Sequence, residues 1–68
     1  MPKVRDAIRV VEEDGWEYQR MRGDHRIYKH PRKAGIVVIA GHARDDLPEG
    51  TWQSIQRQAG LKGAKEQR

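Results

Sequence analysis

Basic side chains gather in one short stretch of this 68-residue sequence, and two histidines, His25 and His30, and one tyrosine stand among them. Only one carboxylate, that of Asp24, falls within the stretch. Positive charge attracts phosphate groups, and an aromatic ring such as that of Tyr28 can stack on a nucleic-acid base. The cluster therefore predicts a surface that binds a polyanion. Its basic members are Arg20, Arg22, Arg26, Lys29, Arg32 and Lys33.

His25 adds proton-transfer chemistry to this cluster, because histidine exchanges protons near neutral pH. Such a group could take the proton from an RNA 2′-hydroxyl, and nearby arginine or lysine could stabilise the charge that forms on the phosphate. Lys29 is a better placed helper than His30, because residues four apart on a strand share a face. These residue types suit metal-free ribonuclease chemistry. They also suit RNA binding without cleavage, or an acidic protein partner.

No metal and no cofactor are expected. The sequence has no cysteine, and His25 and His30 point to opposite faces because they lie five residues apart on one predicted strand. His30 precedes a proline, so we interpret it as a structural residue at a strand end. We interpret His42 as a loop residue, and the only serine, Ser54, as a solvated residue in the middle of a helix.

Length and composition restrict the class of protein. One small domain is the most that 68 residues can form, which excludes dinucleotide-binding folds and enzymes built around deep clefts. The 14 lysines and arginines outnumber the 10 aspartates and glutamates, which gives a net charge of +4. The longest apolar run, Ile36 to Ala40, is far shorter than the ~20 residues of a membrane span. We therefore expect a cytoplasmic protein without membrane contact.

Two segments have the apolar spacing of helices. From Pro2 to Asp14, apolar residues recur three and four positions apart, and Gly15 suits the left-handed conformation that follows a helix. A second helix is expected to open at Leu47 and Pro48 and to end at Gly60. The expected buried faces are Val4, Ala7, Ile8 and Val11 in the first helix, and Trp52, Ile55 and Ala59 in the second.

Three strands are expected between the helices. Residues 16–22 and 25–30 alternate in polarity on either side of a turn at Gly23 and Asp24, and Ile36–Ala40 is interpreted as a buried strand. The predicted fold class is α+β, in the order α-β-β-β-α. It is a three-stranded antiparallel sheet with both helices on one face and the other face open. Residues 1–62 are expected to form the domain, and 63–68 a frayed charged tail.

Two registers are open for the first hairpin. A three-residue turn would place Trp16, Tyr18 and Tyr28 on the core face, and we prefer it because it pairs the two tyrosines. A two-residue turn at Gly23 and Asp24 would instead group Tyr18 with His25, Ile27 and Lys29. Both registers put His25 and Lys29 on one face. The preferred register predicts the pairs Glu17–Lys29, Tyr18–Tyr28, Arg20–Arg26 and Met21–His25.

Several motifs, in order along the chain, resemble the HicA-type (YcfA-like) toxin family. Residues 4–16 are similar to the opening helix of that family. Gly23–Pro31 resembles its Gly-Ser-His strand and Lys-His-Pro ending, and residues 41–62 resemble its closing loop and helix. The resemblance covers roughly residues 3–62, and the motifs are specific because all of them occur in order at close spacing.

The resemblance implies a double-stranded-RNA-binding-like fold and an mRNA endoribonuclease that halts translation, held inactive by a HicB-type antitoxin. The catalytic histidine of the family falls on His25, and Asp24 stands where the family has serine. That carboxylate could orient His25 or repel phosphate. The alternatives are therefore a weakened toxin and a non-catalytic RNA-binding module of the same fold. RNA contacts are expected from Arg22, Lys29, Arg26, Arg20 and Lys33.

Overall fold

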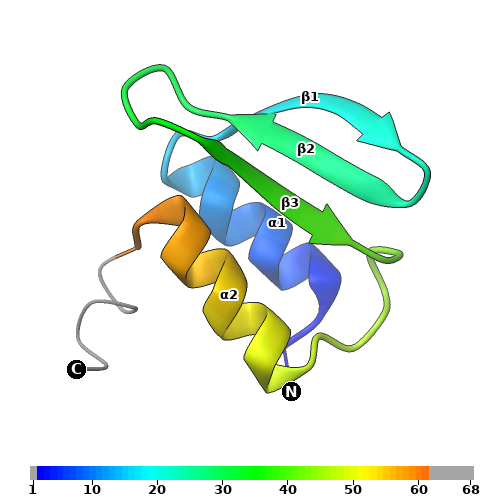
Figure 1. The fold of residues 1–68 in the computed structure, drawn as a ribbon. Coiled ribbons are helices and arrows are strands. Elements are labelled where there is room, and N and C mark those ends of the chain that lie inside the picture. The colour runs from blue at the N-terminus through cyan, green and yellow to red at the C-terminus, as the bar shows by residue number, and fades with distance from the viewer. Residues whose placement is uncertain (1, 62–68) are drawn as a thin grey trace.

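The computed structural model describes residues 2–61 and contains two helices and three strands (Figure 1). The predicted α-β-β-β-α order is confirmed. The tail predicted for residues 63–68 lies outside the described residues. In chain order the elements are α1 (Val4–Glu13), β1 (Glu17–Arg22), β2 (His25–Lys29), β3 (Ile36–Ala40) and α2 (Glu49–Ala59).

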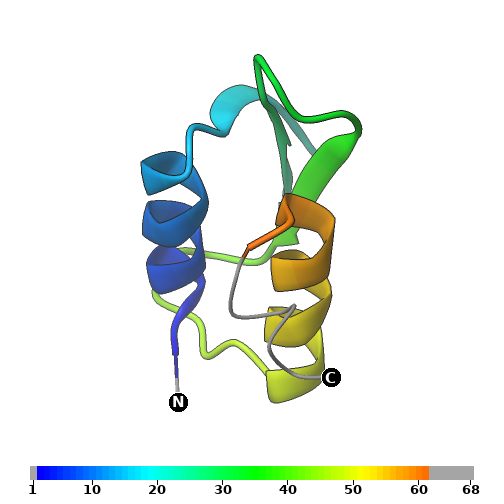
Figure 2. The same ribbon diagram turned by 90° about the vertical axis from the view of Figure 1, so that its left-hand side faces the viewer.

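The three strands form one antiparallel sheet in the order β1-β2-β3, and both helices lie against the same face of it (Figures 1 and 2). β3 is the strand that both helices contact most, whereas every residue of β1 is exposed. The opposite face of the sheet carries neither helix. Neither α1 nor α2 is long and apolar enough to cross a bilayer.

The core lies between the helices and strands β2 and β3. Burying each large aliphatic or aromatic side chain there contributes about 1.5–3 kcal/mol relative to leaving it in water. The predicted helix faces are confirmed, except that Ile8 and Trp52 are only half-buried. The buried residues are Val4, Ala7, Val11, Trp16, Tyr28, Val37, Ile39, Leu47, Ile55 and Ala59.

Both helices end in the same hydrogen-bonded motif, as predicted from their glycines. Gly15 and Gly60 have φ angles of 105° and 65°, a region that L side chains rarely adopt. The Trp16 N–H donates to the Val11 carbonyl at 3.0 Å, and the Leu61 N–H donates to a carbonyl of α2 at 3.1 Å. This is the Schellman arrangement, which folds the residue after the glycine back onto its helix.

Two side chains tie the C-terminal ends of the helices together. The Trp16 indole Nε1 donates to the Ala59 carbonyl at 3.3 Å and to the Asp14 carboxylate at 3.2 Å. The Lys33 ammonium donates to the same two groups, at 2.6 Å from Asp14 Oδ2 and 3.0 Å from the Ala59 oxygen. The positive charge of Lys33 also favours the carbonyl end of α2, where the helix dipole is negative.

His30 fixes the turn that follows β2. Its Nδ1 accepts the backbone N–H groups of Arg32 at 3.0 Å and Lys33 at 3.2 Å. The proton of the neutral ring therefore lies on Nε2, which donates to the Asp14 carbonyl at 2.8 Å. The ring also meets Trp16 edge to face, with centroids 5.2 Å apart. His30 is therefore a structural residue, as predicted.

The loop between β3 and α2 is attached to the start of α1. The Val4 N–H donates to the Asp45 carbonyl at 2.9 Å, and the Leu47 N–H donates to the Pro2 carbonyl at 2.8 Å. The Lys3 ammonium lies 2.7 Å from Asp46 Oδ1. The hydrogen bond from Lys3, followed by its charge, holds the pKa of the Asp46 carboxyl below its ordinary value.

The β1–β2 hairpin combines parts of both predicted registers. The turn has two residues, so Arg22 pairs with His25, and the predicted Met21–His25 and Arg20–Arg26 pairs are wrong. A register shift between Tyr18 and Arg20, a β-bulge, then takes up one residue of β1. The pairs Tyr18–Tyr28 and Glu17–Lys29 are therefore formed as predicted.

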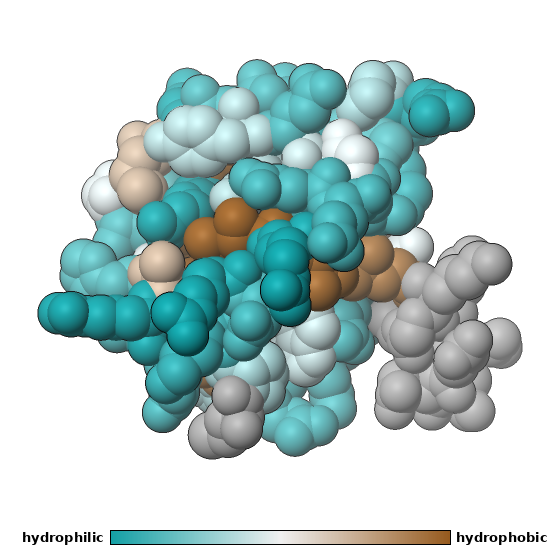
Figure 3. All heavy atoms as spheres, turned by 180° about the vertical axis from the view of Figure 1, so that it is seen from behind, coloured by the Kyte–Doolittle hydropathy of each residue, from teal (hydrophilic) through white to brown (hydrophobic). Residues whose placement is uncertain are grey.

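The predicted burial of Tyr18 in the core is wrong. Its ring meets Tyr28 edge to face, with centroids 5.9 Å apart, but Tyr18 is 50% exposed and Met21 is 46% exposed. The helices pack mainly under β3, and every residue of β1 is exposed. Seen from behind, hydrophobic side chains are visible in the middle of a largely hydrophilic surface (Figure 3).

Candidate active site

The bulge in β1 determines which side chains share the uncovered face of the sheet with His25. Directly paired residues of neighbouring strands point to the same side. Arg22 pairs with His25, and Arg20 pairs with Ile27, so both arginines join the His25 face. The face therefore combines cationic or ionisable side chains from β1 and β2 with aliphatic side chains from β2 and β3. Its members are Arg20, Arg22, His25 and Lys29, together with Ile27, Ile36, Val38 and Ala40, and with Glu17 opposite Lys29 at the end far from the turn.

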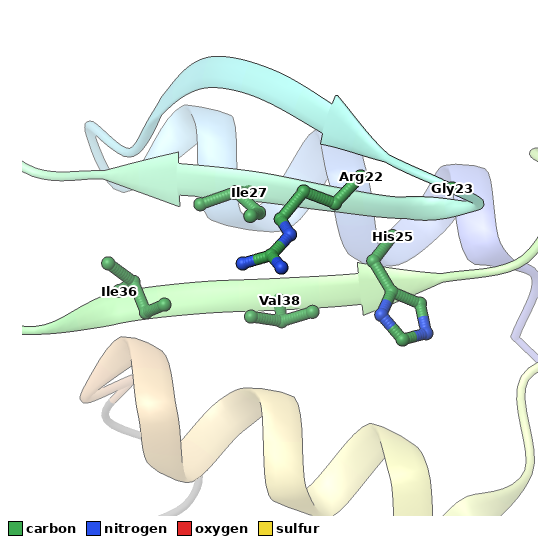
Figure 4. Close-up of a pocket in the computed structure, with 6 residues that line it drawn as sticks. All are labelled: Arg22, Gly23, His25, Ile27, Ile36 and Val38. Atoms are coloured by element: carbon green, nitrogen blue, oxygen red, sulfur yellow. The ribbon is translucent and has the colours of Figure 1, made fainter.

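Two adjoining hollows lie on this face and share one wall made by Arg22, Ile27 and Ile36. The first has a volume of about 530 Å³ and also includes His25, Gly23 and Val38 in its lining (Figure 4). The second has a volume of about 350 Å³ and is completed by Gln19, Arg20 and Lys29. Both volumes fall in the range of small-ligand sites.

The side chains of Arg22 and His25 border the first hollow from neighbouring strands. The guanidinium of Arg22 extends from β1 across β2 toward β3, and His25 stands at the turn end of the hollow (Figure 4). The His25 side chain is 55% exposed, so its ring nitrogens can meet a ligand from solvent. A ligand phosphate in this hollow would face a proton-transfer group and a planar cation together.

Asp24 lies beside His25 in the turn. Its Oδ1 is 3.5 Å from His25 Nε2, which is an ion-pair distance and is longer than a formed N–H···O hydrogen bond. Its carbonyl accepts the Gly41 N–H at 3.2 Å, which ties the turn to the end of β3. The backbone of Asp24 is thus held, while its exposed carboxylate stays within reach of the imidazole.

Two of the predicted RNA-binding residues lie apart from this face. Arg26 is half-buried and donates from Nη1 to the Gly41 carbonyl at 3.0 Å. Lys33 is held by Asp14 and by the carbonyl end of α2. Of the predicted basic residues, the structure therefore brings Arg20, Arg22 and Lys29 together with His25, and it separates Arg26 and Lys33 from them.

The aliphatic residues of the two hollows were not predicted from the sequence. Ile36–Ala40 was predicted to be a buried strand, yet only Val37 and Ile39 are buried. Ile36 is 44% exposed, because it faces the side of the sheet that carries neither helix. A continuous apolar run is typical of a strand covered on both faces, so the pattern gave no sign of one open side.

The charge of the two hollows is positive. None of the described residues that line them is acidic. Glu17 is the cross-strand partner of Lys29 at the end far from the turn. His42 lies in the exposed loop after β3, where its backbone N–H donates to Asp45 Oδ2 at 3.1 Å. Among residues 2–61, no three His, Cys, Asp or Glu side chains are arranged to hold a metal ion.

Fold and surface together define a class. The protein is a small α-β-β-β-α domain of the double-stranded-RNA-binding-like type, with a cationic sheet face that both helices leave open. A comparison with protein families matches residues 4–61 to the HicA toxin of bacterial toxin–antitoxin systems, so the chain belongs to the HicA toxin family. It is therefore a toxin of a toxin–antitoxin system, and an antitoxin is its partner. A comparison with curated proteins found no match.

Proposed function

We propose that this toxin is a metal-independent endoribonuclease that cleaves mRNA in the cytoplasm and so inhibits translation, until a HicB-type antitoxin binds it. The observation that supports the proposal is the pairing of Arg22 with His25 beside one open hollow. Acid–base catalysis needs a proton-transfer group within reach of the reacting atoms, and phosphate chemistry needs positive charge beside it. A group of each kind lines this hollow, His25 for proton transfer and Arg22 for charge.

The proposed reaction uses the RNA's own nucleophile. The 2′-oxygen loses its proton and attacks the adjacent phosphorus, and the bond from phosphorus to the 5′-oxygen breaks. The products are a 2′,3′-cyclic phosphate and a 5′-hydroxyl end. His25 either accepts the 2′-hydroxyl proton or donates a proton to the leaving 5′-oxygen, and water serves at the other position. Arg22 stabilises the negative charge that develops on the phosphoryl oxygens.

Three further residues have proposed roles around His25. Asp24 orients the imidazole toward the phosphate through the charge of its carboxylate, which lies 3.5 Å from His25 Nε2. Arg20 and Lys29, which line the second hollow, bind the phosphate of a neighbouring nucleotide. We leave Arg26 and Lys33 out of the proposed RNA contacts, because their cationic groups are already bound within the protein.

The test is cleavage of a long single-stranded RNA by the antitoxin-free protein in the presence of EDTA. His25→Ala is expected to lower the rate by about 10²- to 10⁴-fold, the usual contribution of an acid–base catalyst. His42→Ala removes an exposed imidazole from a loop and serves as the matched control, with the wild-type rate expected. Unchanged cleavage by His25→Ala would refute the role of this residue.

The cleavage rate of Asp24→Ser, measured in the same assay, shows how the Asp24 carboxylate affects catalysis. A slower rate would support the orienting role, and a faster rate would mean that the charge of Asp24 repels phosphate and weakens this toxin. RNA binding without cleavage in every variant would favour a binding module instead. That second candidate rests on the cluster of Arg20, Arg22 and Lys29, which can hold phosphates whether or not His25 reacts.

A further inference from the structure

An apolar strip runs along the middle of the two hollows, on the face of the sheet that carries neither helix. The strip consists of Ile27 from β2 and of Ile36 and Val38 from β3. Ile27 and Val38 are half-buried, and Ile36 is 44% exposed. Neighbouring branched side chains left open in this way favour a ligand that covers them, because burial of apolar surface lowers the free energy.

Cationic side chains border this strip at both ends. Arg22 and His25 line the hollow at the turn end, and Arg20 and Lys29 line the adjoining one. His25 and Lys29 lie four residues apart on β2, a separation of about 13 Å at the usual rise of a strand. The long side chains at these positions can lean over the strip, so a ligand that fits would carry negative charges on either side of a flat apolar group, as a nucleotide between two phosphates does.

The guanidinium of Arg22 supplies a second surface for such a flat group. It reaches over the sheet between Ile27 and Val38, and it belongs to the walls of both hollows (Figure 4). Guanidinium planes stack on nucleic-acid bases, and an aliphatic strip can cover the other face of the ring. A base inside a duplex is stacked on its neighbours, so only an unpaired base could enter.

We propose that the strip of Ile27, Ile36 and Val38, together with the Arg22 guanidinium, binds one unpaired RNA base next to the phosphate that faces His25. The inference rests on the proposed function, since it takes RNA as the ligand of this face. It assigns the strip, which has no part in proton transfer, to affinity and base preference.

Binding of a trinucleotide RNA tests this directly, because its central base lies between two phosphates. The probe is compared with the same trinucleotide lacking only the central base, by NMR titration of the full antitoxin-free chain carrying His25→Ala. That background keeps the RNA uncleaved. Removal of the base is expected to weaken binding by about 5- to 150-fold, the range for one stacked base.

Ile36→Thr identifies the strip as the surface involved. Thr keeps the β-branched shape and removes apolar contact, so affinity for the intact trinucleotide should fall about fourfold. Affinity for the abasic trinucleotide should stay the same. Met21→Thr is the matched control, because Met21 is 46% exposed but lies on the other side of the sheet, and it should change neither affinity.

Two results would overturn the inference. The first is equal affinity for the intact and the abasic trinucleotide. The second is that Ile36→Thr weakens the antitoxin complex but not trinucleotide binding, which would make the strip a protein-docking surface. His25-dependent cleavage combined with either result would leave the proposed function standing, whereas absence of both cleavage and RNA binding would refute the proposed function itself.

Discussion

At the residue scale, the neighbours of His25 depend on a turn that is held at its backbone. The Asp24 carbonyl is bound to the Gly41 N–H at the end of β3, while the Asp24 carboxylate is exposed beside the imidazole. Arg22 precedes the turn and pairs with His25 across it. A carboxylate, an imidazole and a guanidinium are therefore brought together by a hairpin whose turn is hydrogen-bonded to the end of β3.

The sequence could identify His25 and Lys29 as members of one face, because every register of the hairpin gives that result. The sequence could not distinguish basic side chains that are open to a ligand from those that are hydrogen-bonded within the protein. The partners of Arg26 and Lys33 lie 15 to 26 residues away in the chain, at Gly41, Asp14 and Ala59. A local count of positive charge contains no information about such long-range contacts.

Tyr28 predicts a fall in stability at alkaline pH. Burial, followed by the charge of Glu12, raises the pKa of the Tyr28 phenol above its ordinary value of 10.0. The folded protein then holds this proton when the unfolded chain has lost it, so the contribution is complete below about pH 10 and is lost as the pH rises through the folded pKa. The loss amounts to at most about 1.4 kcal/mol per pH unit.

Urea unfolding between about pH 9 and about pH 11 measures this contribution. Tyr28→Phe keeps the buried ring and removes the proton, so its free energy of unfolding should fall less steeply than that of the wild type. Tyr18→Phe, which changes the half-exposed ring of the same pair, should flatten the profile much less than Tyr28→Phe does, because the charge of Tyr18 is the last and smallest of the causes that raise the pKa of Tyr28. Parallel profiles for Tyr28→Phe and wild type would contradict the assignment.

At the element scale, the hairpin satisfies two local preferences that conflict in a regular ladder. The two-residue turn at Gly23 and Asp24 fixes the register near the turn, and the pairing of Tyr18 with Tyr28 fixes it at the other end. The two registers differ by one residue, which the bulge beside Gln19 takes up. Each preference was visible in the sequence, but Gln19 has no feature that marks a bulge.

The conformation of Gly23 makes the turn depend on glycine. Its φ is 61°, and Asp24 is not among the residues with positive φ, which matches a type II′ turn with glycine at its first central position. A Cβ at Gly23 would meet no atom within 4 Å, so the effect of a side chain there is on the backbone alone. Gly23→Ala should lower the free energy of unfolding by about 1–2 kcal/mol.

Gly50 is the matched control for this change, because it also has open space but lies in the first turn of α2 without a positive φ. Gly50→Ala should raise the free energy of unfolding by up to about 1 kcal/mol, since alanine is the better helix residue. Chemical denaturation measures both variants. Opposite signs are expected, and equal effects would mean that the turn does not require glycine.

At the scale of the whole molecule, the two helices are placed unevenly under the sheet. They pack against β3 and leave β1 at the edge, so one face of the sheet and the whole of β1 are open. The predicted layer order was therefore correct, but the sequence did not show that the helices lie under β3 and not under the centre of the sheet. Helix periodicity shows which residues face a sheet, and it does not show which strands they cover.

The open face, rather than the net charge, should determine how salt affects RNA binding. Two neutralised phosphates, one at Arg22 and one held by Arg20 and Lys29, predict a slope of about −1.4 for the logarithm of affinity against the logarithm of salt concentration, at ~0.7 for each phosphate on a single strand. Arg22→Ala should reduce that slope by about 0.7. Fluorescence anisotropy with a labelled single-stranded RNA and the His25→Ala background measures it.

Comparing Arg9→Ala with Arg22→Ala distinguishes RNA binding at a defined site from binding to the electrostatic field of the whole protein. Arg9 is exposed on α1, and either substitution lowers the net charge of +4 by the same single unit. If phosphates bind at the sheet face, Arg9→Ala should keep the slope of the parent, because charges beyond a Debye length of about 10 Å are screened. Equal losses of slope in the two variants would instead mean that RNA binds the general positive field, with no defined phosphate positions beside His25.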